Sequence, residues 1–138
     1  MSHRLKVVLD TNVLLVSISS KSKHHWLFQK LLAQAFDIVI TNEILMEYEE
    51  IISQKYSVSV SKNVIRALLL LPNVLKRDVY YNWFLITDDA DDNKFVDCAI
   101  AAGADYIVTH DRHFGILKQV EFPIVNVVTF DQFRTLLG

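Results

Sequence analysis

Short apolar segments alternate along the chain with longer amphipathic segments. Residues 5–9 are apolar and β-branched and stop at Asp10, a pattern typical of a buried strand that runs into a polar loop. Further strands are predicted at residues 36–40, 106–108 and 124–128, and residues 79–86 are compatible with another. Apolar spacing of three to four residues predicts helices at 25–32, 44–52, 61–71, 92–103 and 131–137.

This alternation predicts an α/β fold with a parallel sheet. Strands that alternate with helices are joined by right-handed crossovers, which place helices on both faces of the sheet. In such sheets the ligand site lies beyond the carboxyl ends of the strands. Asp10 follows the first strand and Asp111 follows the strand at 106–108, so both are expected at this edge. Asp92 is expected near them, because helices begin on the side where the preceding strands end.

The composition agrees with one soluble domain that spans residues 1–138. The hydrophobic fraction of 51% is high, as expected for a sheet that is covered on both faces. The apolar runs are too short to cross a bilayer and the N-terminus lacks the apolar core of a signal peptide, so a cytoplasmic protein without a membrane segment is expected. The single cysteine, Cys98, has no second thiol for an internal disulfide and is expected in the core.

The distribution of charged residues along the chain predicts that the protein binds a metal cation. A formal net charge of −2 predicts no broad basic surface, so any nucleic acid would be held locally. Residues 88–92 contain four aspartates. Such a cluster repels phosphate groups unless a cation lies between them, and a metal ion is the natural mediator.

Acidic residues follow predicted strands or open predicted helices at several separated places. They are Asp10, Glu47, Asp92 and Asp111. If the fold brings them together, their oxygens suit Mg²⁺, and Mn²⁺ accepts the same ligands. Such a site can hydrolyse a phosphodiester, since the metal activates water and neutralises charge in the transition state. The chain has only three glycines and no Gly-rich phosphate loop, and it lacks the motifs of serine hydrolases and zinc proteases.

Four segments resemble PIN domains in sequence and in order. They are Val-Leu-Asp-Thr-Asn-Val at 8–13, the glutamate at 47, Asp-Asp-Asn-Lys-Phe at 91–95 and Gly-Ala-Asp-Tyr-Ile-Val-Thr-His-Asp at 103–111. The resemblance covers nearly the whole chain and is strongest to the toxin components of bacterial toxin–antitoxin systems. It implies a single-domain α/β/α sandwich with a parallel sheet of about five strands. It also implies an Mg²⁺- or Mn²⁺-dependent endoribonuclease, a homodimer and inhibition by an antitoxin protein.

The resemblance assigns roles to individual residues. The matching catalytic and metal-binding acids are Asp10, Glu47, Asp92 and Asp111. Asp10 and Asp111 would ligate the metal directly, whereas Glu47 and Asp92 would ligate it or position water. Asn12 and Thr109 would orient the carboxylates through hydrogen bonds. Asp91 is the alternative third acid, because a helix boundary inferred from sequence can be displaced by a few residues.

Other interpretations stay open for these residues. Glu47 competes with Glu49 and Glu50 on the same helix, and Asp91 and Asp92 are also typical helix caps. Arg112 and His113 follow Asp111 and are candidates for contact with RNA phosphate, or they lie in a solvated loop.

Two rival functions follow from the same pattern. A haloacid-dehalogenase-type enzyme also places an aspartate after its first strand, but it requires Asp-x-Asp where this chain has Asp-Thr-Asn at 10–12. The other rival is a catalytically silent PIN-like module that binds RNA or a protein. The RNA expected for the enzyme is single-stranded, because unpaired bases are accessible to protein side chains.

Overall fold

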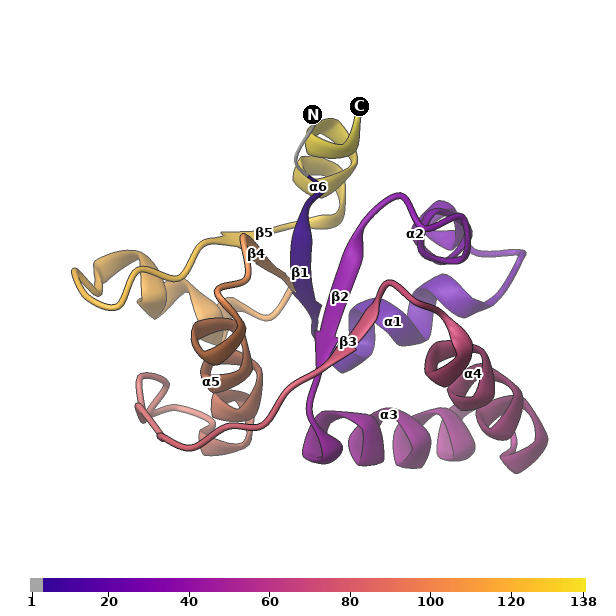
Figure 1. Cartoon of the computed structure of the whole chain (residues 1–138), viewed down its shortest axis with the longest axis horizontal. Coiled ribbons are helices and arrows are strands. Elements are labelled where there is room, and N and C mark those ends of the chain that lie inside the picture. The colour runs from indigo at the N-terminus through magenta and orange to yellow at the C-terminus, as the bar shows by residue number, and fades with distance from the viewer. Residues whose placement is uncertain (1–3) are drawn as a thin grey trace.

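A five-stranded parallel sheet forms the centre of the molecule (Figure 1). The computed structural model describes residues 4–138. The sheet order is β3-β2-β1-β4-β5, and every neighbouring pair is parallel. The strands are β1 (Lys6–Leu9), β2 (Asp37–Ile40), β3 (Val74–Lys76), β4 (Tyr106–Val108) and β5 (Val127–Val128). The central strands are apolar runs because both of their faces are covered, which confirms the predicted α/β fold.

Helices cover both faces of the sheet. They are α1 (Thr11–Ile18), α2 (His25–Leu32), α3 (Asn42–Lys55), α4 (Val58–Leu70), η1 (Ala90–Asp92), α5 (Asn93–Ala102), η2 (Arg112–Gln119) and α6 (Phe130–Leu137). The chain crosses the sheet from β1 through β2 to β3, and then returns past β1 to β4 and β5. Right-handed crossovers in these opposite directions place α1 to α4 on one face and α5 on the other, as Figure 1 shows.

Three predicted elements differ from the observed ones. The prediction of a strand at 79–86 was wrong, because the third strand is β3 and residues 79–86 have no regular structure. Asn73 is the reason: its buried amide donates to the carbonyls of Leu31 and Phe36, which brings the chain into the sheet directly after α4. The strand expected at 124–128 is shortened to β5. The polar loop expected after Asp10 is absent within the described chain, because α1 begins at Thr11.

The other predicted helices and strands agree with the observed ones within a few residues, whereas η2 was not predicted. Gly103 ends α5 in the left-handed conformation with φ of 62°, which a residue without Cβ adopts at little cost. Cys98 is buried, as expected. Among residues 4–138, no helix is both long and apolar enough to cross a membrane.

Candidate active site

The sheet topology places a site between the ends of β1 and β4. The chain leaves these neighbouring strands in opposite directions, and in parallel sheets such a switch point is where ligands bind. Asp10 follows β1 directly, and its amide donates to the Val108 carbonyl at the end of β4, at 3.1 Å. Asp111 lies three residues beyond Val108. The structure therefore brings Asp10 and Asp111 to the same edge of the sheet.

Asp10 is held in a fixed orientation. Its carboxylate is only 7% exposed, and Thr109 Oγ1 donates to its Oδ2 at 2.7 Å. Thr109 Oγ1 in turn accepts from the Asp111 amide at 3.0 Å. Burial raises the pKa of Asp10, the bonds from Thr109 and the Thr11 amide oppose this, and the charges of Asp111 and Glu47 raise it further. Thr109 thus lies where the sequence analysis expected a residue that orients a carboxylate.

Asp92 joins the same group from the end of η1. Burial, together with the nearby charges of Asp111, Asp89 and Asp10, raises its pKa to about 7. Its Oδ2 is buried without a hydrogen-bond partner among the described residues, and lies 3.6 Å from His113 Nδ1. His113 Nδ1 is also 3.3 Å from Asp111 Oδ1. His113 therefore lies between two of the predicted acids.

Glu47 lies beside Asp10 but has partners within the protein. Its Oε1 is 2.6 Å from Lys94 Nζ, and the Thr11 hydroxyl donates to its Oε2. Lys94 is 6% exposed and also contacts Asp91 Oδ1 at 2.8 Å. Asp91 thus pairs with Lys94, whereas Asp92 faces Asp111 and Asp10. This placement favours Asp92 over Asp91 as the third acid.

The arrangement fits a hard divalent cation. Several carboxylates converge at one edge of the sheet, two have raised pKa values, and one has a buried oxygen without a hydrogen-bond partner in residues 4–138. Asp89, Asp92 and His113 each offer a ligand atom within 4.8 Å of the other two, so this trio can hold a metal ion. A cation would offset both the cost of burying these carboxylates and their mutual repulsion, which together raise these pKa values.

Comparisons with known proteins agree with this architecture. Residues 6–113 match the family model described as the PIN domain. The chain belongs to the PIN-domain family. A comparison with curated protein sequences found no match to this PIN domain.

Solved structures resemble this PIN domain in fold. VapBC2 from Rickettsia felis, bound to a DNA fragment from its promoter, superposes with a TM-score of 0.63 at 18% identity and covers 91% of this chain and 98% of its own. VapC20 from Mycobacterium tuberculosis, a sarcin–ricin loop cleaving toxin, has a TM-score of 0.57 at 10% identity and covers 79% and 92%. FitAcB from Neisseria gonorrhoeae has a TM-score of 0.56 at 14% identity and covers 90% and 97%.

The structure adds residues that the sequence analysis did not single out. Asp89 adjoins Asp92, and Thr11 and Lys94 hold Glu47. Asp89 is one of four neighbouring aspartates, and nothing in their spacing shows which of them face the site. Lys94 lies two residues after this acidic run, within the 91–95 segment that resembles PIN domains, but that segment did not indicate its partner. Their roles depend on contacts between α3, α5 and the start of α1.

Two predicted site residues, Asn12 and Arg112, have exposed side chains. Asn12 is exposed and makes no hydrogen bond to a carboxylate within residues 4–138, although it lines a hollow with Asp10 and Asp111. Arg112 is exposed at the start of η2. Contact of Arg112 with RNA stays a prediction.

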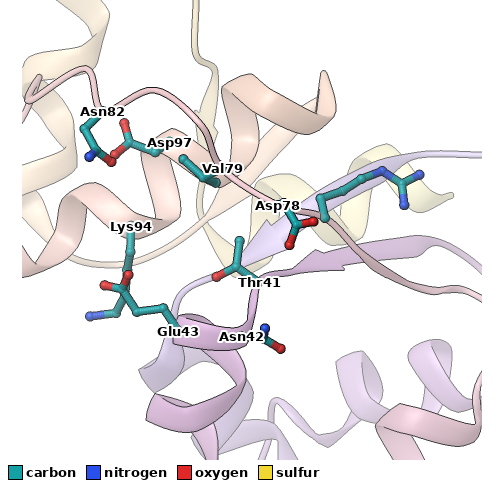
Figure 2. Close-up of a pocket in the computed structure, with 9 residues that line it drawn as sticks. Thr41, Asn42, Glu43, Asp78, Val79, Asn82, Lys94 and Asp97 are labelled. Atoms are coloured by element: carbon teal, nitrogen blue, oxygen red, sulfur yellow. The ribbon is translucent and has the colours of Figure 1, made fainter.

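A polar hollow of about 330 Å³ adjoins Lys94 (Figure 2). Thr41, Glu43, Asp78, Asn82 and Asp97 contribute to its wall. Asp97 is buried, and its Oδ1 accepts from the Trp83 amide at 3.1 Å, which fixes the segment between β3 and η1. Burial raises the pKa of Asp97, opposed by this bond. Asp10, Asp92 and Asp111 do not line this hollow, so it is distinct from the group of acids.

The raised pKa of Asp92 predicts a pH dependence of stability without metal. The folded state binds a proton at Asp92 up to about pH 7, whereas the unfolded chain releases it near 3.8. The stabilisation is therefore complete below the unfolded value and is lost as the pH rises through the folded value. In EDTA, the free energy of unfolding from urea titrations should fall between pH 5 and 8 by roughly 1 kcal/mol more in wild type than in Asp92→Asn.

The exposed Asp88, changed to asparagine, is the control for this pH series. Asp88→Asn should follow the wild-type profile, because its side chain lies outside the buried group. Parallel profiles for wild type and Asp92→Asn would contradict the assigned environment of Asp92.

Proposed function

We propose that this PIN domain is a divalent-metal-dependent endoribonuclease that hydrolyses RNA phosphodiester bonds. The observation that carries the proposal is the convergence of Asp10, Asp92 and Asp111 at the switch point of the sheet. The PIN fold is typical of metal-dependent nucleases, and the similar VapC20 is described as a toxin that cleaves the sarcin–ricin loop.

The proposed division of labour follows from the contacts. Asp10, Asp92 and Asp111 would hold Mg²⁺ or Mn²⁺, with Asp89 and His113 beside them. When bound, the ion supplies Lewis acidity toward phosphate oxygens and water. Thr109 keeps the Asp10 carboxylate oriented, and the ion pair with Lys94 holds Glu47 close to Asp10. Glu47 would join the ligands or position the attacking water.

We also propose that the chain is the toxin of a toxin–antitoxin pair and binds an antitoxin protein. Support comes from the VapBC and FitAB complexes among the similar structures. Exposed apolar side chains such as Leu69 and Leu70 at the end of α4 provide surface for a protein partner. The homodimer implied by the family resemblance stays a prediction.

One observation favours the second candidate, a catalytically silent binding module. Glu47 is already neutralised by Lys94 and held by Thr11, so it would have to exchange a partner to ligate a metal directly. In this case the protein would bind RNA or a protein without cutting RNA.

Cleavage of a structured RNA with single-stranded loops separates the two candidates. Wild type should cut with Mg²⁺ or Mn²⁺ and not with EDTA, and Asp111→Asn should lower the rate by about 100-fold or more. Asp88→Asn is the charge-matched control and should cut like wild type. RNA that is bound but not cut under either metal would favour the silent module.

A further inference from the structure

A second hollow opens directly beside the acids. Its volume is about 420 Å³, and Asp10 and Asp111 form part of its wall. Val13 and Val16 of α1 contribute an apolar side, and Phe130 at the start of α6 another. The hollow is therefore largely apolar at one end and carries the candidate catalytic carboxylates at the other.

Aromatic rings line this hollow, and the imidazoles of His24 and His110 lie with their centroids 6.3 Å apart at an interplanar angle of 39°. The imidazole of His24 stacks on Phe130 with ring centroids 3.9 Å apart and an interplanar angle of 9°. His110 packs on the same phenyl ring at 4.7 Å, and its Nε2 accepts from the Phe130 amide at 3.4 Å. Phe130 is itself buried, so the two imidazoles are the rings that reach the hollow. Their packing on Phe130 holds them in place before any ligand arrives.

We propose that this hollow binds one unpaired nucleobase of the RNA substrate, stacked on His24 with His110 at its side, and with a neighbouring phosphate at the acids. The inference rests on the proposed nuclease function and adds a substrate subsite to it. Unpaired bases typically stack on aromatic side chains, including histidine, and present their edges to polar groups. Asn12, exposed at the same hollow, offers an amide to such an edge.

The electrostatics favour a base over an anionic group. Asp10 and Asp111 repel any ligand that brings negative charge into the hollow without a cation. Burial, Lys23 and His110 lower the pKa of His24, so its ring offers an uncharged face at neutral pH. The chain carries a formal net charge of −2, which does not favour binding of the RNA backbone. Stacking of a base therefore supplies affinity that backbone contacts do not.

Nucleoside titrations test the subsite without metal or cleavage. Adenosine, guanosine, cytidine and uridine carry no phosphate, so the acids do not repel them. Added at millimolar concentration in EDTA, at least one should shift the NMR signals of the His24 ring and the Val13 and Val16 methyl groups. His24→Ala, which removes the stacking ring, and Val16→Phe, which fills the hollow from an exposed helix position, should each abolish the shifts.

Two further variants separate stacking from misfolding. His24→Phe retains a flat ring and should retain binding of the nucleoside. Leu32→Phe enlarges an equally exposed apolar side chain on α2 and should bind like wild type. Thermal unfolding of every variant checks that the fold is intact. Absence of shifts with all four nucleosides, or shifts that His24→Ala and Val16→Phe leave unchanged, would overturn the subsite whether or not the protein cleaves RNA.

A second measurement places the subsite relative to the cleaved bond. In an RNA that the wild type cuts, single abasic residues are introduced one at a time on both sides of the cleavage position. Loss of the stacked base should slow cleavage by about 10- to 100-fold at one position and little elsewhere. Uniform rates across the series would reject the proposal while leaving the nuclease itself intact. If the hollow instead receives a side chain of a protein partner, neither nucleosides nor abasic residues will have an effect, which also rejects it.

Discussion

Asp10→Asn should lower metal-dependent RNA cleavage by about 100-fold or more and leave the metal-free protein at least as stable as wild type at pH 8. Asp10 is buried beside Asp111 and Glu47, so its charge is unfavourable until a cation is bound. Asparagine removes this charge and retains an oxygen that can accept the bond from Thr109. A residue important only for folding would give the opposite result for stability.

Thermal unfolding with and without Mg²⁺ measures this effect directly. Wild type should gain thermal stability as Mg²⁺ is added, because a ligand that binds only the folded state stabilises it. Asp10→Asn should lose most of this gain. Asp88→Asn, which removes the same charge from an exposed position, should keep both the gain and the cleavage rate. A gain that survives in Asp10→Asn would remove Asp10 from the proposed ligands.

Asn93→Ala should destabilise the protein by about 2–3 kcal/mol and lower cleavage by about tenfold. Asn93 is 7% exposed, and its Oδ1 accepts from the Ile86 amide at 2.9 Å. Its Nδ2 donates to the carbonyls of Ile86 at 2.8 Å and Ala90 at 3.2 Å. Alanine leaves these backbone groups without their partner in a buried place. The segment that carries Asp89 and Asp92 then loses its attachment to α5.

Urea denaturation and cleavage assays report the two effects of Asn93→Ala separately. Asn82→Ala is the matched control, since Asn82 is exposed in the same segment before η1. It should unfold at the wild-type midpoint. Equal midpoints for Asn82→Ala and Asn93→Ala would show that the hydrogen bonds of Asn93 contribute little.

The buried strands could be predicted because their own sequences carry the signal. The strands β1, β2 and β4 are apolar runs, since helices cover both faces of the central sheet. The strand β3 could not be predicted, because it is a three-residue, partly exposed edge strand. Its start is fixed by bonds from Asn73 to carbonyls 42 and 37 residues away in the chain. A local pattern contains no information about such distant partners.

Part of the candidate site could likewise be predicted from local sequence, and part could not. Asp10 and Asp111 were expected together because the carboxyl ends of parallel strands meet at one edge of the sheet. The choice between Asp91 and Asp92 depends on the helix phase after η1, and the pairing of Lys94 with Asp91 favours Asp92. The partners of Glu47 come from α1 and α5, so its spacing on α3 did not reveal them.

The order of residues along the chain was enough to predict the alternation of strands and helices, the parallel sheet and the acidic residues at its edge. Each of these features depends on the periodicity and chemistry of neighbouring residues. The periodicity is a local property, because it follows from the direction of side chains along a helix or a strand. Which acids face one another, and where a hollow lies beside them, became clear only from the folded chain. Thr109 and Asp10, for example, are 99 residues apart and meet only because β1 and β4 pair. Contacts of this kind depend on the packing of the whole chain.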